Sequence, residues 1–300
     1  MTIDYHIPVM PAESIGGLKL FAGATAVDAT FGGGGHSRLI LEQVGEGRLF
    51  AFDQDEDAAG NVINDDRLFF IRHNFRYLKN FLRYYNVAKV DAIFADLGVS
   101  SHDFDEAGRG FSFRFEGKLD MRMNRDAKTD ASVVVNNYPE EELVFIFRMY
   151  GEIKNAGRLV AEIVRFRNEA QIKTTEQLKE IALKCAPRKI ENKYLAQVFQ
   201  ALRIEVNDEM EALKEFLEAS LEMLKPGGRL AVITYHSLED RLCKNFLKSG
   251  NFEGKVEKDF YGNLISPFQV INRKVIIPGP EELEVNPRSR SAKLRIAEKI

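Results

Sequence analysis

The sequence of 300 residues predicts an α/β fold: a mostly parallel sheet with helices on both faces, interrupted by an all-α insertion. Over the first hundred residues, short apolar runs alternate with helix-like segments, which is the pattern of βαβ units and a parallel sheet. The alternation stops between Ala131 and about Gln200, where helix signals occur without a convincing strand, and it resumes at Leu230–Tyr235. We therefore predict a sheet domain of residues 1–103 and 205–300 and an inserted helical domain of residues 104–204.

The first part of the sheet domain alternates strands with helices. The predicted strands are Ala24–Asp28, Arg48–Asp53, Leu68–Arg72 and Asp91–Leu97. The predicted helices between them are Ser37–Val44, Asp55–Ile63 and Phe75–Tyr85.

Capping signals mark helices further along the chain. The stretch "YPEEELVFIFRMYG" has Pro139 near the first helical position and Gly151 just past the end. Thr174, with Gln177 three residues later, forms a capping box. After the last apolar run, Ser237 predicts a second capping box with Asp240 and a helix through about residue 247.

The stretch "VDATFGGGGHSRLI" is predicted to be a strand, a tight glycine turn and the start of a helix. Glycines permit positive φ there, and a helix N-terminus offers free N–H groups to a ligand. The spacing is not that of a dinucleotide-binding loop, and His36 stands where a phosphate-binding lysine would be. The remaining acid-x-x-x-Gly-x-Gly pattern of Asp28, Gly32 and Gly34 resembles motif I of Rossmann-like methyltransferases, with Thr30 in place of the first glycine. A glycine-rich connection without a ligand is the alternative.

Polar side chains follow the next three strands. Asp53 ends the second strand and is placed to bind ribose hydroxyls of NAD or of S-adenosylmethionine, with a helix cap as the alternative. Asn74 and Phe75 follow the third strand. Asn74 could hydrogen-bond the edge of an adenine or cap a helix, and Phe75 could pack on the face of the adenine or belong to the core. Asp96 ends the fourth strand, at the edge where open α/β sheets bind ligands.

Composition limits the class of protein. The apolar share of 45% and charged share of 29% are those of a soluble globular chain, and no apolar run is long enough to span a membrane. The two cysteines, Cys185 and Cys243, define neither a metal site nor a disulfide framework, which suggests a cytoplasmic protein. The net charge is −3, but basic residues gather in residues 109–128 and after Pro287. Such stretches are either solvated surface or nucleic-acid contacts.

Eight motifs occur in order along the chain: "DATFGGGGHSRLIL", "DLGVSS", "RGFSFR", "LDMRM", "FQALRIEVN", "PGGRL", "HSLEDR" and "NPRSRSAKLR". Together they resemble the RsmH (MraW) family from residue 6 to the C-terminus. The resemblance implies a Rossmann-like, S-adenosylmethionine-dependent methyltransferase with an inserted helical domain. It also implies methylation of N4 of a cytidine in the decoding region of 16S rRNA, within the small ribosomal subunit. The oligomeric state stays open, a homodimer included.

The family's cofactor contacts are carried over by position in the motifs. They fall on Gly34, Gly35, His36, Asp53, Phe75, Asp96 and Asp103. The family usually has glutamine or histidine at the position of Asp103, and the neighbouring His102 is an alternative. The helical insertion is then a candidate for recognition of the RNA substrate.

A catalytic role is expected for two residues. Methyl transfer from a sulfonium is an in-line displacement, so catalysis depends mostly on positioning and electrostatics. A hydrogen bond from the cytosine amine to Asp96 would make this poor nucleophile more reactive. His236 could accept the released proton, or it could order the loop at the end of its strand.

RNA binding gives the basic stretches a role. Phe111 and Phe113 could stack on the target cytosine or belong to the core of the insertion. Phosphate contacts are expected from Arg109, Arg114, Arg122, Arg288 and Arg290. No metal is expected. The competing functions are a nicotinamide-dependent oxidoreductase, a non-catalytic ribosome-assembly factor and a small-molecule methyltransferase.

Overall fold

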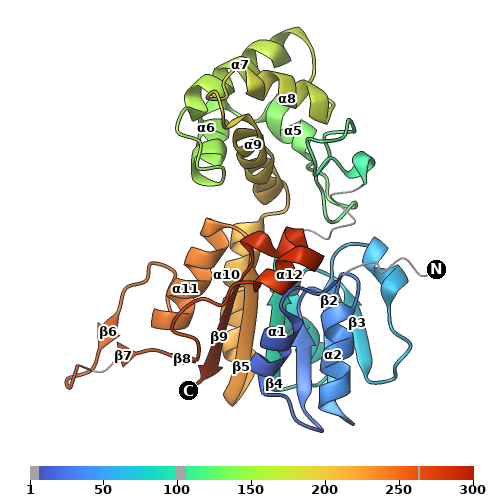
Figure 1. The fold of residues 1–300 in the computed structure, drawn as a ribbon, viewed down its shortest axis with the longest axis vertical. Helices are drawn as coiled ribbons and strands as arrows, with labels where there is room; N and C mark the ends of the chain where they lie inside the picture. Colours follow the sequence, from blue (N-terminus) through green and yellow to red (C-terminus); the bar gives the residue numbers. More distant parts are fainter. Residues whose placement is uncertain (1–6, 99–105, 263) are drawn as a thin grey trace. The chain divides into compact units, whose positions relative to one another are not determined.

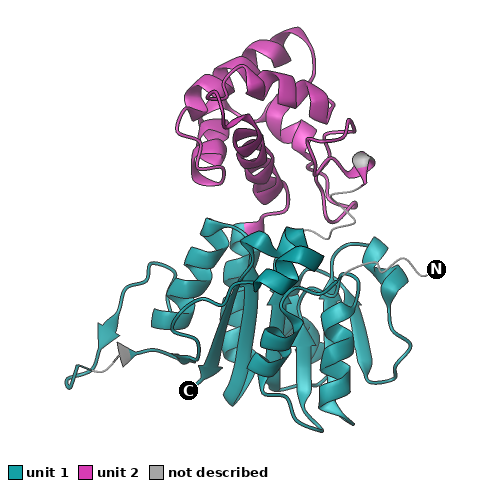
Figure 2. Cartoon of the chain, viewed as in Figure 1, with its two compact units in different colours: residues 1–98, 210–300 teal, residues 99–209 magenta. Residues whose placement is uncertain are grey.

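The fold is that of a computed structural model, which describes residues 7–98, 106–262 and 264–300. The chain divides into two compact units (Figure 2): residues 1–98 with 210–300, and residues 99–209. The predicted insertion, residues 104–204, falls inside the second unit. No described helix is long and apolar enough to cross a membrane.

The first unit is built on a seven-stranded sheet of order β3-β2-β1-β4-β5-β9-β8 (Figure 1). The five strands from β3 to β5 are parallel, and β9 pairs antiparallel with both β5 and β8. The predicted α/β fold with a mostly parallel sheet is confirmed. The strands are β1 (Thr25–Asp28), β2 (Arg48–Asp53), β3 (Leu68–Arg72), β4 (Val90–Asp96), β5 (Leu224–Thr234), β8 (Phe268–Val270) and β9 (Lys293–Lys299). A separate two-stranded ribbon pairs β6 (Glu257–Lys258) with β7 (Leu264–Ile265).

Helices cover both faces of the sheet because its buried strands are apolar on both sides. The helices of this unit are α1 (Pro11–Leu18), α2 (Gly35–Val44), α3 (Leu78–Tyr84), α10 (Glu209–Met223), α11 (Ser237–Ser249) and α12 (Pro280–Val285). Short 3₁₀ turns are η1 (Asp57–Asn61), η2 (Phe75–Tyr77) and η4 (Pro287–Ser291).

Side chains alternate between the two faces along each strand. On one face, Val27, Ile93 and Val232 join a core that also contains Leu82 of α3 and Phe216 of α10. On the other face, Ala26, Phe94 and Ile233 pack with Leu18 of α1 and Ile40 of α2. A residue at or just after the end of a strand, an even number of positions from a member of this second set, therefore lies on the face covered by α1 and α2.

The second unit is helical over its described residues, 106–209. Its helices are α5 (Ala131–Asn137), α6 (Glu140–Met149), α7 (Ala156–Glu169), α8 (Thr175–Leu183) and α9 (Glu191–Val206), with a 3₁₀ turn η3 (Ala107–Arg109). They enclose a core that includes Phe147, Leu159 and Leu202. The predicted capping box of Thr174 and Gln177 starts α8, as both of its hydrogen bonds are present.

Several predicted elements differ from the structure in kind or in bounds. The helix expected over Asp55–Ile63 is only the 3₁₀ turn η1, in a stretch that contains Gly60 and Asn61, both poor helix formers. The capping box expected from Ser237 and Asp240 begins one residue earlier, because His236 has the extended backbone of an N-cap and pairs with Glu239.

Candidate active site

Three carboxylates stand at the carboxyl ends of neighbouring parallel strands. Asp28 ends β1, Asp53 ends β2 and Asp96 ends β4. Each lies an even number of residues from a side chain on the α1 and α2 face (Ala26, Leu49 and Phe94, respectively), so all three belong to that face. The carboxyl edge of this sheet is thus acidic on the side that carries the glycine loop.

The glycine loop joins β1 to α2 through two left-handed residues, Gly32 (φ 51°) and Gly34 (φ 75°). A Cβ on Gly34 would lie 3.0 Å from the ring of Phe31, so a side chain there would be strained by its φ and would crowd that ring. The N–H of Gly32 donates a 2.8 Å hydrogen bond to Oδ2 of Asp53. The loop is therefore fixed against the end of β2.

Asp28 is fully buried and holds the start of the loop and the start of α2 together. Its Oδ2 accepts a 2.6 Å hydrogen bond from Oγ of Ser37 in α2, and its Oδ1 accepts one from the N–H of Thr30. Burial raises the pKa of Asp28 to about 6, and these hydrogen bonds work in the opposite direction.

Asp96 is tied to two neighbouring residues, through its carboxylate and through its backbone N–H. Its Oδ1 accepts a 2.7 Å hydrogen bond from the hydroxyl of Tyr235, and its own N–H donates to Oγ1 of Thr30 at 2.7 Å. Its side chain is 13% exposed. The pKa of Asp96 is raised to about 7, mainly by burial; the negative charge of Asp28 contributes to this rise, and the bond from Tyr235 opposes it.

Tyr235 is a site residue that the sequence reasoning missed. Strand alternation was the available signal, because Tyr235 lies two residues after Ile233, which pairs with Asp96 in the sheet. Burial and the neighbouring Asp96 raise the pKa of the Tyr235 hydroxyl, so it stays protonated and donates.

His36 is buried beside Asp96. Its Nε2 lies 2.9 Å from the carbonyl oxygen of Val9, an acceptor, so Nε2 carries the hydrogen. Its Nδ1 lies 3.9 Å from Oδ2 of Asp96, and its ring packs against Phe94 with centroids 4.4 Å apart. His36 is therefore buried between the end of β4 and the segment around Val9.

The residues expected to bind the adenosine end of a cofactor lie after β2 and β3. Asp53 accepts hydrogen bonds from Gly32 and also from the N–H of Asp55 at 2.9 Å. Phe75 packs against the core with an edge contact to Phe216 at 5.1 Å. Asn74 caps η2 by accepting from the N–H of Arg76, which is the capping role that the sequence left open.

His236 caps α11. Its side chain accepts from the N–H of Glu239, and its Nε2 lies 3.0 Å from Oε1 of Glu239. The side chain is only 8% exposed. This geometry favours the structural alternative over the predicted role of His236 as a proton acceptor.

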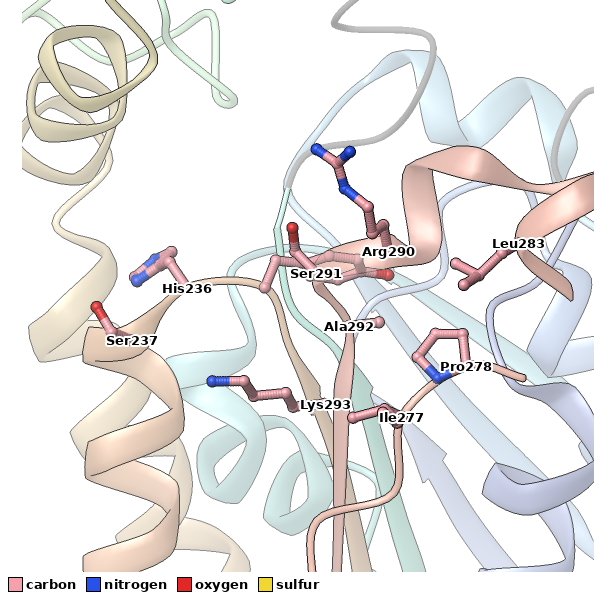
Figure 3. A pocket seen from close by; sticks show the side chains of 10 residues that line it. His236, Ser237, Ile277, Pro278, Leu283, Arg290, Ser291, Ala292 and Lys293 are labelled. Atoms are coloured by element: carbon pink, nitrogen blue, oxygen red, sulfur yellow. The ribbon is translucent and has the colours of Figure 1, made fainter. Parts of the chain in front are cut away.

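A hollow of about 360 Å³ opens beside Tyr235 and His236 (Figure 3). Apolar side chains of Ile277, Pro278 and Leu283 line one part of it, and Arg290 and Lys293 bring positive charge. It therefore combines an apolar wall with groups that suit an anion.

The insertion residues expected to touch RNA divide into two groups. Phe111 is buried in the helical core, and Phe113 packs against that core with an edge contact to Phe199 at 5.6 Å, which supports their alternative role as core aromatics. Arg109 is buried and donates to the carbonyl of Arg122 at 3.0 Å, which gives it a structural role in this unit and leaves the predicted phosphate contact untested.

Arg122 is also committed to the structure of the insertion. It forms an ion pair with Asp120 at 2.7 Å and donates to the carbonyls of Arg125 and Ala127. Arg114 by contrast is exposed, as are Arg288 and Arg290 in the first unit. The expected cofactor contact at Asp103, and its alternative His102, lie outside the described residues.

The sheet order, the glycine loop and the acidic strand ends define a Rossmann-like α/β domain of the methyltransferase class. The model of the MraW methylase family matches residues 4–300. The chain is 60% identical over 298 residues to the ribosomal RNA small subunit methyltransferase H of Bacteroides thetaiotaomicron, covering 99% of this chain and 98% of the relative. It is 55% identical over 300 residues to the protein of the same name from Flavobacterium johnsoniae, covering 100% and 99%. The chain belongs to the MraW methylase family.

Among solved structures, an rRNA methylase from Streptococcus thermophilus is similar with a TM-score of 0.45 and 12% identity, covering 99% of both chains.

Proposed function

We propose that this protein transfers a methyl group from S-adenosylmethionine to N4 of a cytidine in the decoding region of 16S rRNA, within the small ribosomal subunit. Membership of a methylase family and relatives named as small-subunit rRNA methyltransferases support rRNA as the substrate. The observation that carries the choice of an amine is Asp96, a carboxylate held at the carboxyl edge of the sheet next to the glycine loop.

The described residues fit a cationic cofactor better than a pyrophosphate. The left-handed glycines of the loop admit a ligand close to the backbone, and Asp28, Asp53 and Asp96 surround that approach with acidic groups. A sulfonium cation nearby would favour their ionised forms, whereas a pyrophosphate would be repelled. This argues against the nicotinamide-dependent alternative.

The proposed cofactor contacts follow from that fit. Gly34, Gly35 and His36 would line the methionine end, Asp53 the ribose hydroxyls and Phe75 the adenine, with Asp103 as a further contact. For Asp53, ribose binding requires exchange of the hydrogen bond from Gly32 for one from a hydroxyl. When bound, S-adenosylmethionine supplies an electrophilic methyl group.

Asp96 activates the nucleophile in this proposal. The lone pair of an exocyclic cytosine amine is delocalised into the ring, so the amine is a poor nucleophile. A hydrogen bond from the amine to the Asp96 carboxylate, and another to the carbonyl of Leu97, would favour a more tetrahedral nitrogen. As the bond from the methyl carbon to the nitrogen forms, its bond to sulfur breaks. The nitrogen becomes positively charged, the adjacent Asp96 carboxylate stabilises that charge, and the surplus proton then passes to this carboxylate or to water.

RNA is proposed to bind through the exposed arginines Arg114, Arg288 and Arg290. Arg290 is the strongest candidate, because it lines the hollow beside Tyr235 together with Lys293. Arg109 and Arg122 are left out of this set because they hold the insertion together. A homodimer remains a prediction, which analytical ultracentrifugation would test.

The proposed function is tested by mass-spectrometric mapping of methylated cytidines in rRNA from cells with and without this protein. We expect one N4-methylated cytidine of the decoding region to lose that methyl group in cells without the protein. Unchanged rRNA, together with binding of NAD but not of radiolabelled S-adenosylmethionine, would favour an oxidoreductase. Unchanged methylation together with defective subunit assembly would favour a non-catalytic assembly factor.

A further inference from the structure

The hydroxyl of Tyr235 is joined to the carboxylate of Asp96 across the ends of two neighbouring parallel strands. The bond from Tyr235 Oη to Asp96 Oδ1 is 2.7 Å long, a normal length for a hydrogen bond between an O–H donor and an oxygen acceptor. The strands themselves fix the register, because Asp96 pairs with Ile233 and the N–H of Leu97 donates to the carbonyl of Ile233 at 2.9 Å.

The ring of Tyr235 is also fixed in place. Gly98, two residues after Asp96, has a φ of 121°, and a Cβ on it would lie 3.3 Å from the Tyr235 ring. The N–H of Tyr235 donates to Oε2 of Glu239 at 2.9 Å. Both the backbone and the ring of Tyr235 are therefore held where its hydroxyl meets Asp96.

Acidic groups otherwise dominate the surroundings of Asp96. The ionisable groups that face it from the packed elements are Asp28 of β1, His36 of α2, Tyr235 directly after β5, Glu239 of α11 and Glu282 of α12. The three acidic residues among them raise the pKa of Asp96, as burial does. The Tyr235 hydroxyl acts in the opposite direction, because it stabilises the ionised carboxylate.

We infer that Tyr235 is a positioning residue for Asp96: its hydroxyl occupies Oδ1 and fixes the plane of the carboxylate, so that Oδ2 is left to accept a hydrogen bond from the substrate amine. The inference rests on the proposed function. It assigns a role in the reaction to a residue that contacts neither the cofactor nor the amine.

The first test is the pH dependence of kcat for Tyr235→Phe, at saturating S-adenosylmethionine and small subunits. Loss of the hydroxyl should move the acid limb about one pH unit higher, since a hydrogen bond to a charged group contributes about that much. Turnover should then fall about tenfold on the acid limb and approach the wild-type value at high pH. A limb at the wild-type position, or an equal loss at every pH, would overturn the inference.

Tyr85→Phe is the matched control, because Tyr85 packs against Phe50 and Phe69 at the other end of the sheet domain. It should leave the pH profile unchanged. Thermal unfolding of both variants shows whether either has lost its fold.

A second test does not depend on turnover. In protein labelled with ¹³C at aspartate carboxyls, the Asp96 resonance is assigned by its loss in Asp96→Asn. It should titrate at higher pH in Tyr235→Phe than in the wild type, and an identical titration would overturn the inference. Absence of methylation by the wild type would instead contradict the proposed function, whatever the titration gives.

Discussion

The N–H of Asp96 donates a 2.7 Å hydrogen bond to Oγ1 of Thr30. The bond ties the end of β4 to the turn after β1, and the N–H of Thr30 in turn donates to the buried Asp28. Thr30 stands where the usual methyltransferase motif has its first glycine. A glycine could not make this connection, so the substitution adds a link between the loop and Asp96.

Thr30→Val should destabilise the protein by about 1–3 kcal/mol, because it leaves the N–H of Asp96 without its acceptor. Thr30→Ser keeps the hydroxyl and should cost much less. Urea unfolding of the two variants measures the difference. Equal stabilities for the valine and serine variants would show that the hydroxyl contributes nothing.

Asp96→Asn should stabilise the protein, and more so at pH 8 than at pH 5. Burial raises the pKa of Asp96 from 3.8 to about 7, so the folded protein holds this proton more tightly than the unfolded chain. The stability contributed by the protonated form is complete below about pH 4 and is lost as the pH rises to about 7. At pH 8 the gain is of the order of 1–4 kcal/mol, as the full shift implies about 4.

Thermal unfolding of the wild type and of Asp96→Asn at the two pH values measures this effect. Asparagine still accepts from Tyr235 through its amide oxygen, so packing is kept. A stabilisation by Asp96→Asn that is the same at pH 5 and pH 8 would contradict the claim that ionisation of buried Asp96 destabilises the folded protein.

Much of this fold is predictable because it rests on local pattern. Two strands, Arg48–Asp53 and Leu68–Arg72, have the bounds expected from their apolar runs. Thr174 caps α8 as its capping box predicts. Asp28 and Asp96 are found at the strand ends because parallel strands align their carboxyl edges.

The bond between Asp96 and Tyr235 could not be predicted in the same way. It needs the order and register of β4 and β5, which lie 139 residues apart at this point and whose pairing is a property of the whole sheet. The burial of Arg109 and Phe111 likewise depends on how the insertion packs, and their sequence alone fits a surface equally well.

Gly34→Ala should weaken binding of S-adenosylmethionine at least tenfold and lower stability by about 1–2 kcal/mol. The residue has a φ of 75°, and its new Cβ would meet the ring of Phe31 at 3.0 Å. Gly60→Ala is the control, since a Cβ there meets nothing within 4 Å. Calorimetric titration and thermal unfolding measure both effects. Unchanged affinity of Gly34→Ala for S-adenosylmethionine would show that the glycine loop does not contact the cofactor.

Arg290→Gln should weaken binding to small-subunit RNA and reduce the slope of log affinity against log salt by about 1, without loss of stability. Arg122→Gln should instead lower the stability and leave the salt slope unchanged, because Arg122 is paired with Asp120 inside the insertion. Filter binding at several salt concentrations, with thermal unfolding, compares the two. An unaltered salt slope in Arg290→Gln would exclude Arg290 from the RNA surface.

The most direct test of the central claim is the rate at which purified protein forms N4-methylcytidine in unmethylated small subunits, measured by mass spectrometry of rRNA nucleosides. We expect the wild type and the exposed-site control Asp66→Ala to form it at equal rates, and Asp96→Ala to be at least a hundredfold slower with its fold intact. Asp96→Ala at the wild-type rate, or a methyl group on a different atom of the RNA, would contradict the account.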